Sequence, residues 1–271
     1  MFSDLSYAVD DRVAIIAFDR PRKLNAFGEN IRREFPLAVA EADRDPDVRV
    51  VIIKGSGGRA FSTGFDQSES PPVDERRAIE EWRARMARAY QFSRCVMDCS
   101  KPTIAVIEGH CLAGALELAQ MCDIRYCSDD ARFGAIEARF SHGLATMIMP
   151  WILGTRCQEL VYTGDVFDSA EAERIGLVMR VYPKADLERE TLKIAHRMSR
   201  VSLACLQWNK RAMREAFDAM GQRSALQYGV EAAAIIDAQS SPEYETFNRI
   251  RRTEGLRAAM QWQEEQFSQF D

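Results

Sequence analysis

Two glutamates lie in surroundings that suggest a reaction site. Glu117 falls within GHCLAGALELAQMCD (109–123), a stretch typical of a buried helix, and its immediate neighbours are apolar or small. A lone ionised carboxylate in such surroundings is costly, so it either finds polar partners or raises its pKa and stays protonated. Glu137 follows in DDARFGAIEARFSHG (129–143). Two carboxyl groups in one pocket can take opposite roles, one holding a proton and the other accepting one.

Backbone N–H groups near these glutamates are a further candidate element. In FSTGFDQ (61–67), Gly64 allows a tight turn that presents the N–H of Phe65. Gly114 leaves room for close backbone approach at a helix start, where free N–H groups favour negative charge. The N–H groups of Phe65 and Gly114 could therefore form a two-donor oxyanion hole. Each feature alone also fits an ordinary turn, or a glutamate that points into solvent or pairs with an arginine.

The elements that must position these residues alternate between strands and helices, which predicts a layered α/β body. Short runs rich in β-branched residues predict strands at 12–19, 48–55, 103–109, 123–128 and 176–183. Helical patterns cover 29–45, 74–98 and 113–121. Pro36 lies inside the first of these helices and is expected to kink it or to mark a restart.

The chain after about residue 185 reads as helical throughout. We expect four or five helices there, punctuated by Gly221, Gly229, Pro242 and Gly255. The predicted organisation is an α/β core over 1–195 and a helical region over 196–271. Aromatic residues are spread through that region, more than a thin helical layer can bury alone, which favours an interface between copies of the chain.

Composition restricts the class of protein. The chain has 271 residues, 46% of them hydrophobic, and a net charge of −5, so it can form one sizeable core and lacks the basic surplus of a nucleic-acid binder. No signal peptide and no membrane-spanning run is evident, and the seven cysteines show no CxxC pair. These features predict a cytoplasmic protein with free, mostly buried thiols and no metal site.

Four segments in order resemble the crotonase superfamily, the enoyl-CoA hydratase/isomerase family, over roughly residues 10 to 265. They are DRPRKLNAF (19–27), GGRAFSTGFD (57–66), KPTIAVIEGHCLAGALELAQMCDIRYCSDDARFG (101–134) and TGDVFDSAEAERIGLVMRVYP (163–183). The resemblance implies a spiral of strand-strand-helix units followed by helices used in trimerisation. It therefore implies a homotrimer or a dimer of trimers.

The resemblance also implies the site. Members of this family bind acyl-CoA thioesters and stabilise a thioester oxyanion with two backbone N–H groups, which fall on Phe65 and Gly114; the two glutamates of the hydratases fall on Glu117 and Glu137. Coenzyme A is then part of the substrate, and no separate cofactor is expected. Residues expected to contact coenzyme A are Arg22, Lys23, Leu24, Thr63, Asp66 and Gln67.

One departure from the family pattern limits the choice of reaction. The segment after Glu137, ARFSHGLATMIMPWILG (138–154), is shorter than usual and lacks a glycine-rich turn, so Met147, Met149 and Trp151 could crowd the pocket. Reversible hydration of a trans-2-enoyl-CoA to a 3-hydroxyacyl-CoA is the preferred hypothesis. Double-bond isomerisation, another acyl-CoA reaction and a non-catalytic acyl-CoA-binding protein remain alternatives. His142 and His110 are expected to be pocket-edge or structural residues.

Overall fold

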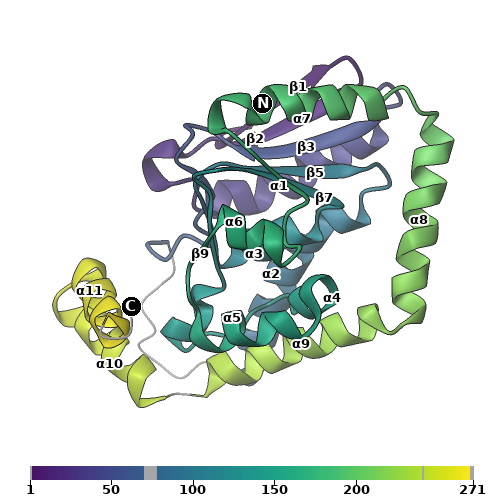
Figure 1. The fold of residues 1–271 in the computed structure, drawn as a ribbon. Coiled ribbons are helices and arrows are strands. Elements are labelled where there is room, and N and C mark those ends of the chain that lie inside the picture. Colours follow the sequence, from purple (N-terminus) through teal and green to yellow (C-terminus); the bar gives the residue numbers. More distant parts are fainter. Residues whose placement is uncertain (1, 70–77, 240, 269–271) are drawn as a thin grey trace.

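The computed structural model describes residues 2–69, 78–239 and 241–268. Its main sheet has six strands in the order β1-β2-β3-β5-β7-β10 (Figure 1). Their bounds are Leu5–Asp10, Val13–Phe18, Val50–Gly55, Thr103–Ile107, Ile124–Ser128 and Arg180–Tyr182. β1 pairs antiparallel with β2, and all the other neighbours are parallel. Parallel neighbours need crossover connections, which the helices between the strands provide.

A second, smaller sheet has the order β4-β6-β8-β9. Its strands are Ala60–Ser62, His110–Leu112, Arg132–Gly134 and Phe167–Asp168. Three successive chain segments, β3-β4, β5-β6 and β7-β8, each give their first strand to the main sheet and their second to the smaller one. This is the repeated strand-strand unit that the sequence predicted.

Helices cover both faces of the main sheet. α1 (Glu29–Arg44), α2 (Ile79–Asp98) and α3 (Gly114–Met121) pack on one face, and α7 (Lys184–Met198) packs on the other (Figure 1). Side chains alternate between faces along each strand, so Val51 and Ile53 of β3 join the first core, whereas Val50 and Ile52 join the second.

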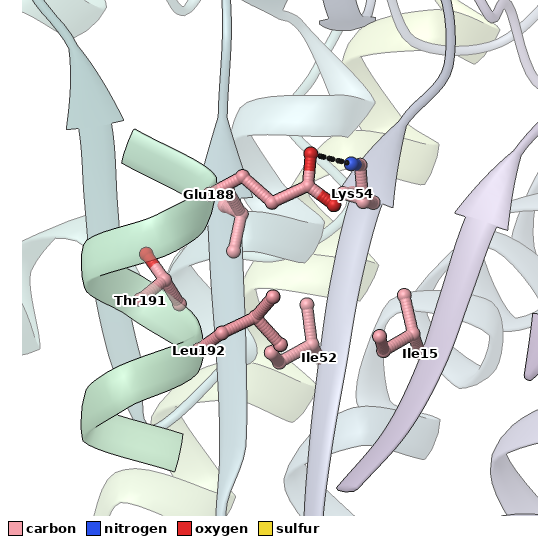
Figure 2. A pocket seen from close by; sticks show the side chains of 7 residues that line it. Ile15, Ile52, Lys54, Glu188, Thr191 and Leu192 are labelled. Carbon is pink, nitrogen blue, oxygen red and sulfur yellow. Dashed lines mark hydrogen bonds and ion pairs between the residues drawn. The ribbon is translucent and has the colours of Figure 1, made fainter. Parts of the chain in front are cut away.

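The contact between α7 and the sheet is tight. Leu192 lies against Ile52, and the Lys54 ammonium pairs with the Glu188 carboxylate at 2.7 Å (Figure 2). The cavity left at this contact measures only about 10 Å³, so there is room for about one water molecule and none for a substrate.

The five strands predicted from sequence are present, although each is shorter than expected. The other five, β1, β4, β6, β8 and β9, were missed: four have only two or three residues, and β1 is a largely exposed edge strand. The helix predicted at 74–98 begins outside the described residues and is observed as α2. The prediction of a restart at Pro36 is wrong, because α1 runs unbroken from Glu29 to Arg44. Proline has no N–H, so the Arg32 carbonyl lacks its usual helical hydrogen-bond donor at position 36. Pro36 and Arg32 line a cavity, where this carbonyl can be solvated.

Two short helices, α4 (Met149–Leu153) and α5 (Cys157–Thr163), join β8 to β9, and α6 (Ser169–Arg174) joins β9 to β10 of the main sheet. Beyond α7 the described residues form α8 (Leu203–Ala219), α9 (Gln222–Ala238), α10 (Pro242–Thr253) and α11 (Leu256–Phe267). α8 runs along the edge of the body, α9 crosses beneath it, and α10 and α11 lie together beyond the end of α9 (Figure 1).

The helical C-terminal region is thus confirmed, with one correction. Gly229 does not end a helix; it lies within α9, where an added Cβ would come within 2.8 Å of the Met147 Cβ, so glycine permits close packing there. The boundary expected between residues 195 and 196 falls inside α7, and the division into a core and a helical region stays a prediction. Among the described residues, no helix is both long and apolar enough to cross a membrane.

Candidate active site

A large cavity of about 1140 Å³ lies between α1, α2, α3 and the C-terminal helices. Eight of the ten residues proposed from sequence line it: Lys23, Thr63, Phe65, Asp66, Gln67, Gly114, Glu117 and Glu137. Its volume exceeds the range of about 300–1,000 Å³ that is usual for drug-sized ligands. The cavity can therefore accommodate a long molecule.

Glu117 is buried in α3, and all eight residues of this helix are buried. Its Oε1 accepts a hydrogen bond from the Ala145 N–H at 3.0 Å, and its Oε2 accepts one from the Thr146 hydroxyl at 2.8 Å. Burial raises the pKa of Glu117 to about 7, and these hydrogen bonds limit the rise because they stabilise the charged form. Glu117 therefore changes charge near neutral pH.

Glu137 lies on a short 3₁₀ helix, Ile136–Phe140, and is the second carboxyl group. Burial first, and then the negative charge of Glu117, raise the pKa of Glu137 well above its ordinary value. The Glu137 Oε2 is buried with no hydrogen-bond partner among the described residues, and the two carboxyl groups influence each other's pKa. Glu137 is thus the carboxyl group that holds a proton, and Glu117 is the one able to accept one.

Two backbone N–H groups meet beside this pair. Gly64 has φ +85°, and an added Cβ there would lie 3.0 Å from the Gly114 nitrogen, so the loop and the start of α3 touch. Phe27 fixes the loop, because its N–H donates to the Gly64 carbonyl at 2.7 Å and its carbonyl accepts from the Asp66 N–H at 3.3 Å. In the described part of the chain, neither the Phe65 N–H nor the Gly114 N–H donates a hydrogen bond. Both are free to bind an oxygen atom in the cavity.

The start of α3 is held in an unusual backbone conformation. Ala113, directly before Gly114, has φ +53° and ψ −133°, a region that side chains other than glycine rarely adopt. Its N–H donates to the Gly134 carbonyl at 2.9 Å, which ties α3 to β8. A Cβ on Gly114 would lie 2.7 Å from the Phe65 ring, so glycine is required for this contact.

The residues expected to bind coenzyme A divide into two groups. Lys23, Thr63, Asp66 and Gln67 line the cavity, whereas Arg22 and Leu24 do not. Lys23 Nζ donates to the Ser68 hydroxyl at 3.2 Å, which joins its segment to the Phe65 loop. Four arginines that the sequence reasoning missed also line the cavity, and two pairs of them lie close in sequence on α1 and α2: Arg32, Arg33, Arg85 and Arg88. The sequence signal that could have identified these arginines was their close spacing within two helices that flank the Gly64 loop.

The segment after Glu137 supports the site rather than crowding it. Met147, Met149 and Trp151 pack into the hydrophobic core and do not line the cavity, so the prediction that they narrow it is wrong. The same segment supplies the Ala145 N–H and the Thr146 hydroxyl that hold Glu117. A backbone donor leaves no trace in side-chain patterns, which explains why the sequence did not reveal it.

The C-terminal helices close one side of the cavity. Phe247, Leu256 and Met260 line it, and the Arg251 guanidinium donates to the Gln67 carbonyl at 2.8 Å. α10 is thereby tied to the loop that carries Phe65. Nothing in the sequence indicated this contact, because it joins residues far apart in the chain.

Comparison with known proteins agrees with this architecture. A model of the family described as enoyl-CoA hydratase/isomerase matches residues 9–257. The chain is 34% identical over 213 residues to the probable enoyl-CoA hydratase echA8 of Mycobacterium tuberculosis, covering 77% of this chain and 80% of that protein. It is 33% identical over 199 residues to the peroxisomal Delta(3,5)-Delta(2,4)-dienoyl-CoA isomerase of Arabidopsis thaliana, covering 69% and 71% respectively.

A solved structure is also closely similar. The crystal structure of an enoyl-CoA hydratase/isomerase from Xanthobacter autotrophicus superposes with a TM-score of 0.93 at 32% identity, covering 98% of this chain and 99% of that one. The predicted spiral fold with C-terminal helices is confirmed. The chain belongs to the enoyl-CoA hydratase/isomerase family of the crotonase superfamily.

Proposed function

We propose that the protein catalyses the reversible hydration of a trans-2-enoyl-CoA to a 3-hydroxyacyl-CoA. The observation that carries this proposal is the carboxyl pair Glu117–Glu137, which holds a proton beside two N–H groups that have no partner in the part of the chain the structure describes. Hydration needs a base for water and an acid for carbon, and this pair offers both. Hydratases are among the relatives, which agrees with this reaction.

The reaction follows from the geometry. The Phe65 and Gly114 N–H groups bind the thioester oxygen, which withdraws electrons from the conjugated double bond and makes C3 electrophilic. Ionised Glu117 takes a proton from a water molecule as its oxygen bonds to C3. Glu137 gives its proton to C2, so one water is added and the pair keeps the same total number of protons.

Substrate binding uses the length and charge of the cavity. Lys23, Thr63, Asp66 and Gln67 would contact the coenzyme A moiety, and Arg32 and Arg88 would favour its phosphate groups through charge. Coenzyme A belongs to the substrate in this proposal, and the reaction needs no further cofactor.

Double-bond isomerisation is the second candidate. The observation that favours it is the burial of Glu117 and of the Glu137 Oε2, which limits the access of water to the two carboxyl groups. A single base that moves a proton along the chain suffices for isomerisation. A relative named as a dienoyl-CoA isomerase agrees with this alternative.

Incubation with crotonyl-CoA in ¹⁸O-labelled water distinguishes the two reactions. Hydration places the label on C3 of the product, and the absorbance of the conjugated thioester falls. If crotonyl-CoA gains no label, and a 3-enoyl-CoA in a parallel incubation gives an unlabelled product with a shifted double bond, hydration is contradicted and the isomerase is supported. Glu117→Gln provides the control, because either reaction requires this base.

We also propose that the protein forms a homotrimer or a dimer of trimers through α8 and α9. Large apolar side chains on these helices are exposed in the single chain, among them Trp208, Met213 and Tyr228. Exposed apolar patches of this kind mark interaction surfaces. Phe247, by contrast, is buried against α11 and lines the cavity. Some aromatic residues of this region therefore lie on the exposed surface, and others form the wall of the cavity.

A further inference from the structure

A histidine–aspartate pair lines the cavity beside the two glutamates. His142 Nδ1 lies 3.0 Å from Asp237 Oδ1, and the Gly143 N–H donates to the same oxygen at 3.1 Å. The Asp237 side chain, on α9, is only 3% exposed, whereas the His142 side chain is 29% exposed. Both residues line the cavity. The reaction described above does not use this pair.

Asp237 fixes the tautomer of the His142 imidazole. A carboxylate only accepts hydrogen bonds, so Asp237 holds the proton on Nδ1 of His142 and leaves Nε2 as the ring nitrogen available to another molecule. Among the described residues, none forms a hydrogen bond with Nε2. A buried carboxylate without donors is costly, and His142 and Gly143 supply two of them.

The position of the pair follows from the segment that joins it to Glu117. Asp237 accepts from the Gly143 N–H, and Glu117 accepts from the Ala145 N–H. Nitrogens two residues apart are separated by at most about 7 Å. The charge of Asp237 also contributes to the raised pKa of Glu137. The pair therefore lies next to the reacting carboxyl groups.

The imidazole also packs edge-on against the Tyr244 ring, with centroids 5.4 Å apart, but its hydrogen bond is not needed to tie α9 to the loop. Asp237 already ties α9 to the loop through the Gly143 N–H, and an added Cβ on Gly143 would lie 2.4 Å from the Ala233 Cα, so the two segments touch directly. Trp82, Met86 and Phe247 are apolar residues that line the same cavity. An imidazole with a free nitrogen in such a wall suits a polar group on a ligand.

We propose that His142, oriented by Asp237, binds a hydroxyl group on the acyl chain beyond C3, so that the preferred substrates are hydroxylated enoyl-CoA thioesters. A hydroxyl group both donates and accepts, and it therefore matches Nε2 in either protonation state. This inference rests on the proposed hydration for its substrate, and it assigns the acyl group that the sequence left open.

The test compares 2-hexenoyl-CoA with its derivatives hydroxylated at C5 or C6. The quantity measured is the ratio of kcat/KM for each hydroxylated substrate to that for the unsubstituted one. We expect this ratio to exceed one in the wild type and to fall about tenfold in His142→Asn, a loss typical of one hydrogen bond to a substrate. Asparagine places an N–H near the position of Nδ1 and has no atom near Nε2, so it keeps the contact with Asp237.

Controls separate substrate binding from structural support. His142→Leu removes both nitrogens and is expected to lower the ratio as much as His142→Asn does. His196→Leu changes a second histidine paired with an aspartate, Asp10 at 3.2 Å, on α7 away from the cavity, and should leave the ratio unchanged. A ratio of one or less in the wild type, or the wild-type ratio in His142→Asn, overturns the proposal.

Binding separates this inference from the proposed function. Dissociation constants of hexanoyl-CoA and of its hydroxylated derivatives, measured by calorimetry, should show the same preference and the same loss in His142→Asn. If the wild type hydrates none of the enoyl thioesters, the proposed function fails, and the ratio of dissociation constants still tests His142. Equal dissociation constants for the two ligand types overturn the assignment of His142.

Discussion

The hydroxyl group of Thr146 is expected to set the pH range in which the enzyme works. Thr146 is buried, and its hydroxyl donates to Glu117 Oε2 at 2.8 Å. Thr146→Val keeps the shape of the side chain and removes this donor. Because the hydrogen bond stabilises ionised Glu117, its loss raises the pKa of Glu117 above the value of about 7.

The size of the effect follows from the strength of such a bond. A hydrogen bond to a charged group contributes about 1.5–3 kcal/mol, and one pKa unit corresponds to about 1.4 kcal/mol. The pKa of Glu117 should therefore rise by about one to two units. Glu117 must be ionised to accept a proton from water, so activity rises with pH through this pKa, and the acidic limb moves upward. At pH 7 the variant should lose about five- to fiftyfold in rate, because the ionised fraction of Glu117 falls by that factor.

The assay is the pH profile of kcat/KM for crotonyl-CoA hydration. Thr146→Ser retains the hydroxyl group and should keep the acidic limb where the wild type has it. Thr146→Val should recover most of its activity at high pH. A uniform loss at every pH with an unmoved limb would refute the reasoning, because it would mean that Thr146 does not act through the ionisation of Glu117.

Three further outcomes are expected. The pKa of Glu117 is about 7 in the folded state rather than 4.5, so the free energy of unfolding falls by about 3 kcal/mol as pH rises through this range. Glu117→Gln should therefore unfold at a higher temperature than the wild type at pH 8. At pH 4 the two proteins should differ little. Gly114→Val should abolish turnover, since its Cβ would lie 2.7 Å from the Phe65 ring; a near-normal rate with unchanged circular dichroism would remove Gly114 from the oxyanion hole. Light scattering should show an assembly that Trp208→Glu weakens, and a stable wild-type monomer at micromolar concentration would contradict the proposed trimer.

Helices and strands could be predicted where a run of neighbouring residues carries the pattern. Continuous β-branched runs, such as the one that forms β3, mark buried parallel strands. Strands of two or three residues carry too few side chains to show a period, so the smaller sheet was invisible in the sequence. Pro36 shows the opposite limit: its propensity predicted a kink or a restart, whereas α1 continues through it beside an open cavity.

The sequence by itself determined the chemistry available in this protein. Residue type and order placed Glu117, Glu137 and Gly114 in the family pattern, because these properties belong to single positions in the chain. Only the tertiary structure decided which groups meet them. The Ala145 N–H, the Thr146 hydroxyl and Asp237 reach the site through loop and helix packing, and their distances, together with burial, set the pKa values of the two glutamates. Charge interactions and desolvation depend on separation in space, which no separation along the chain reveals.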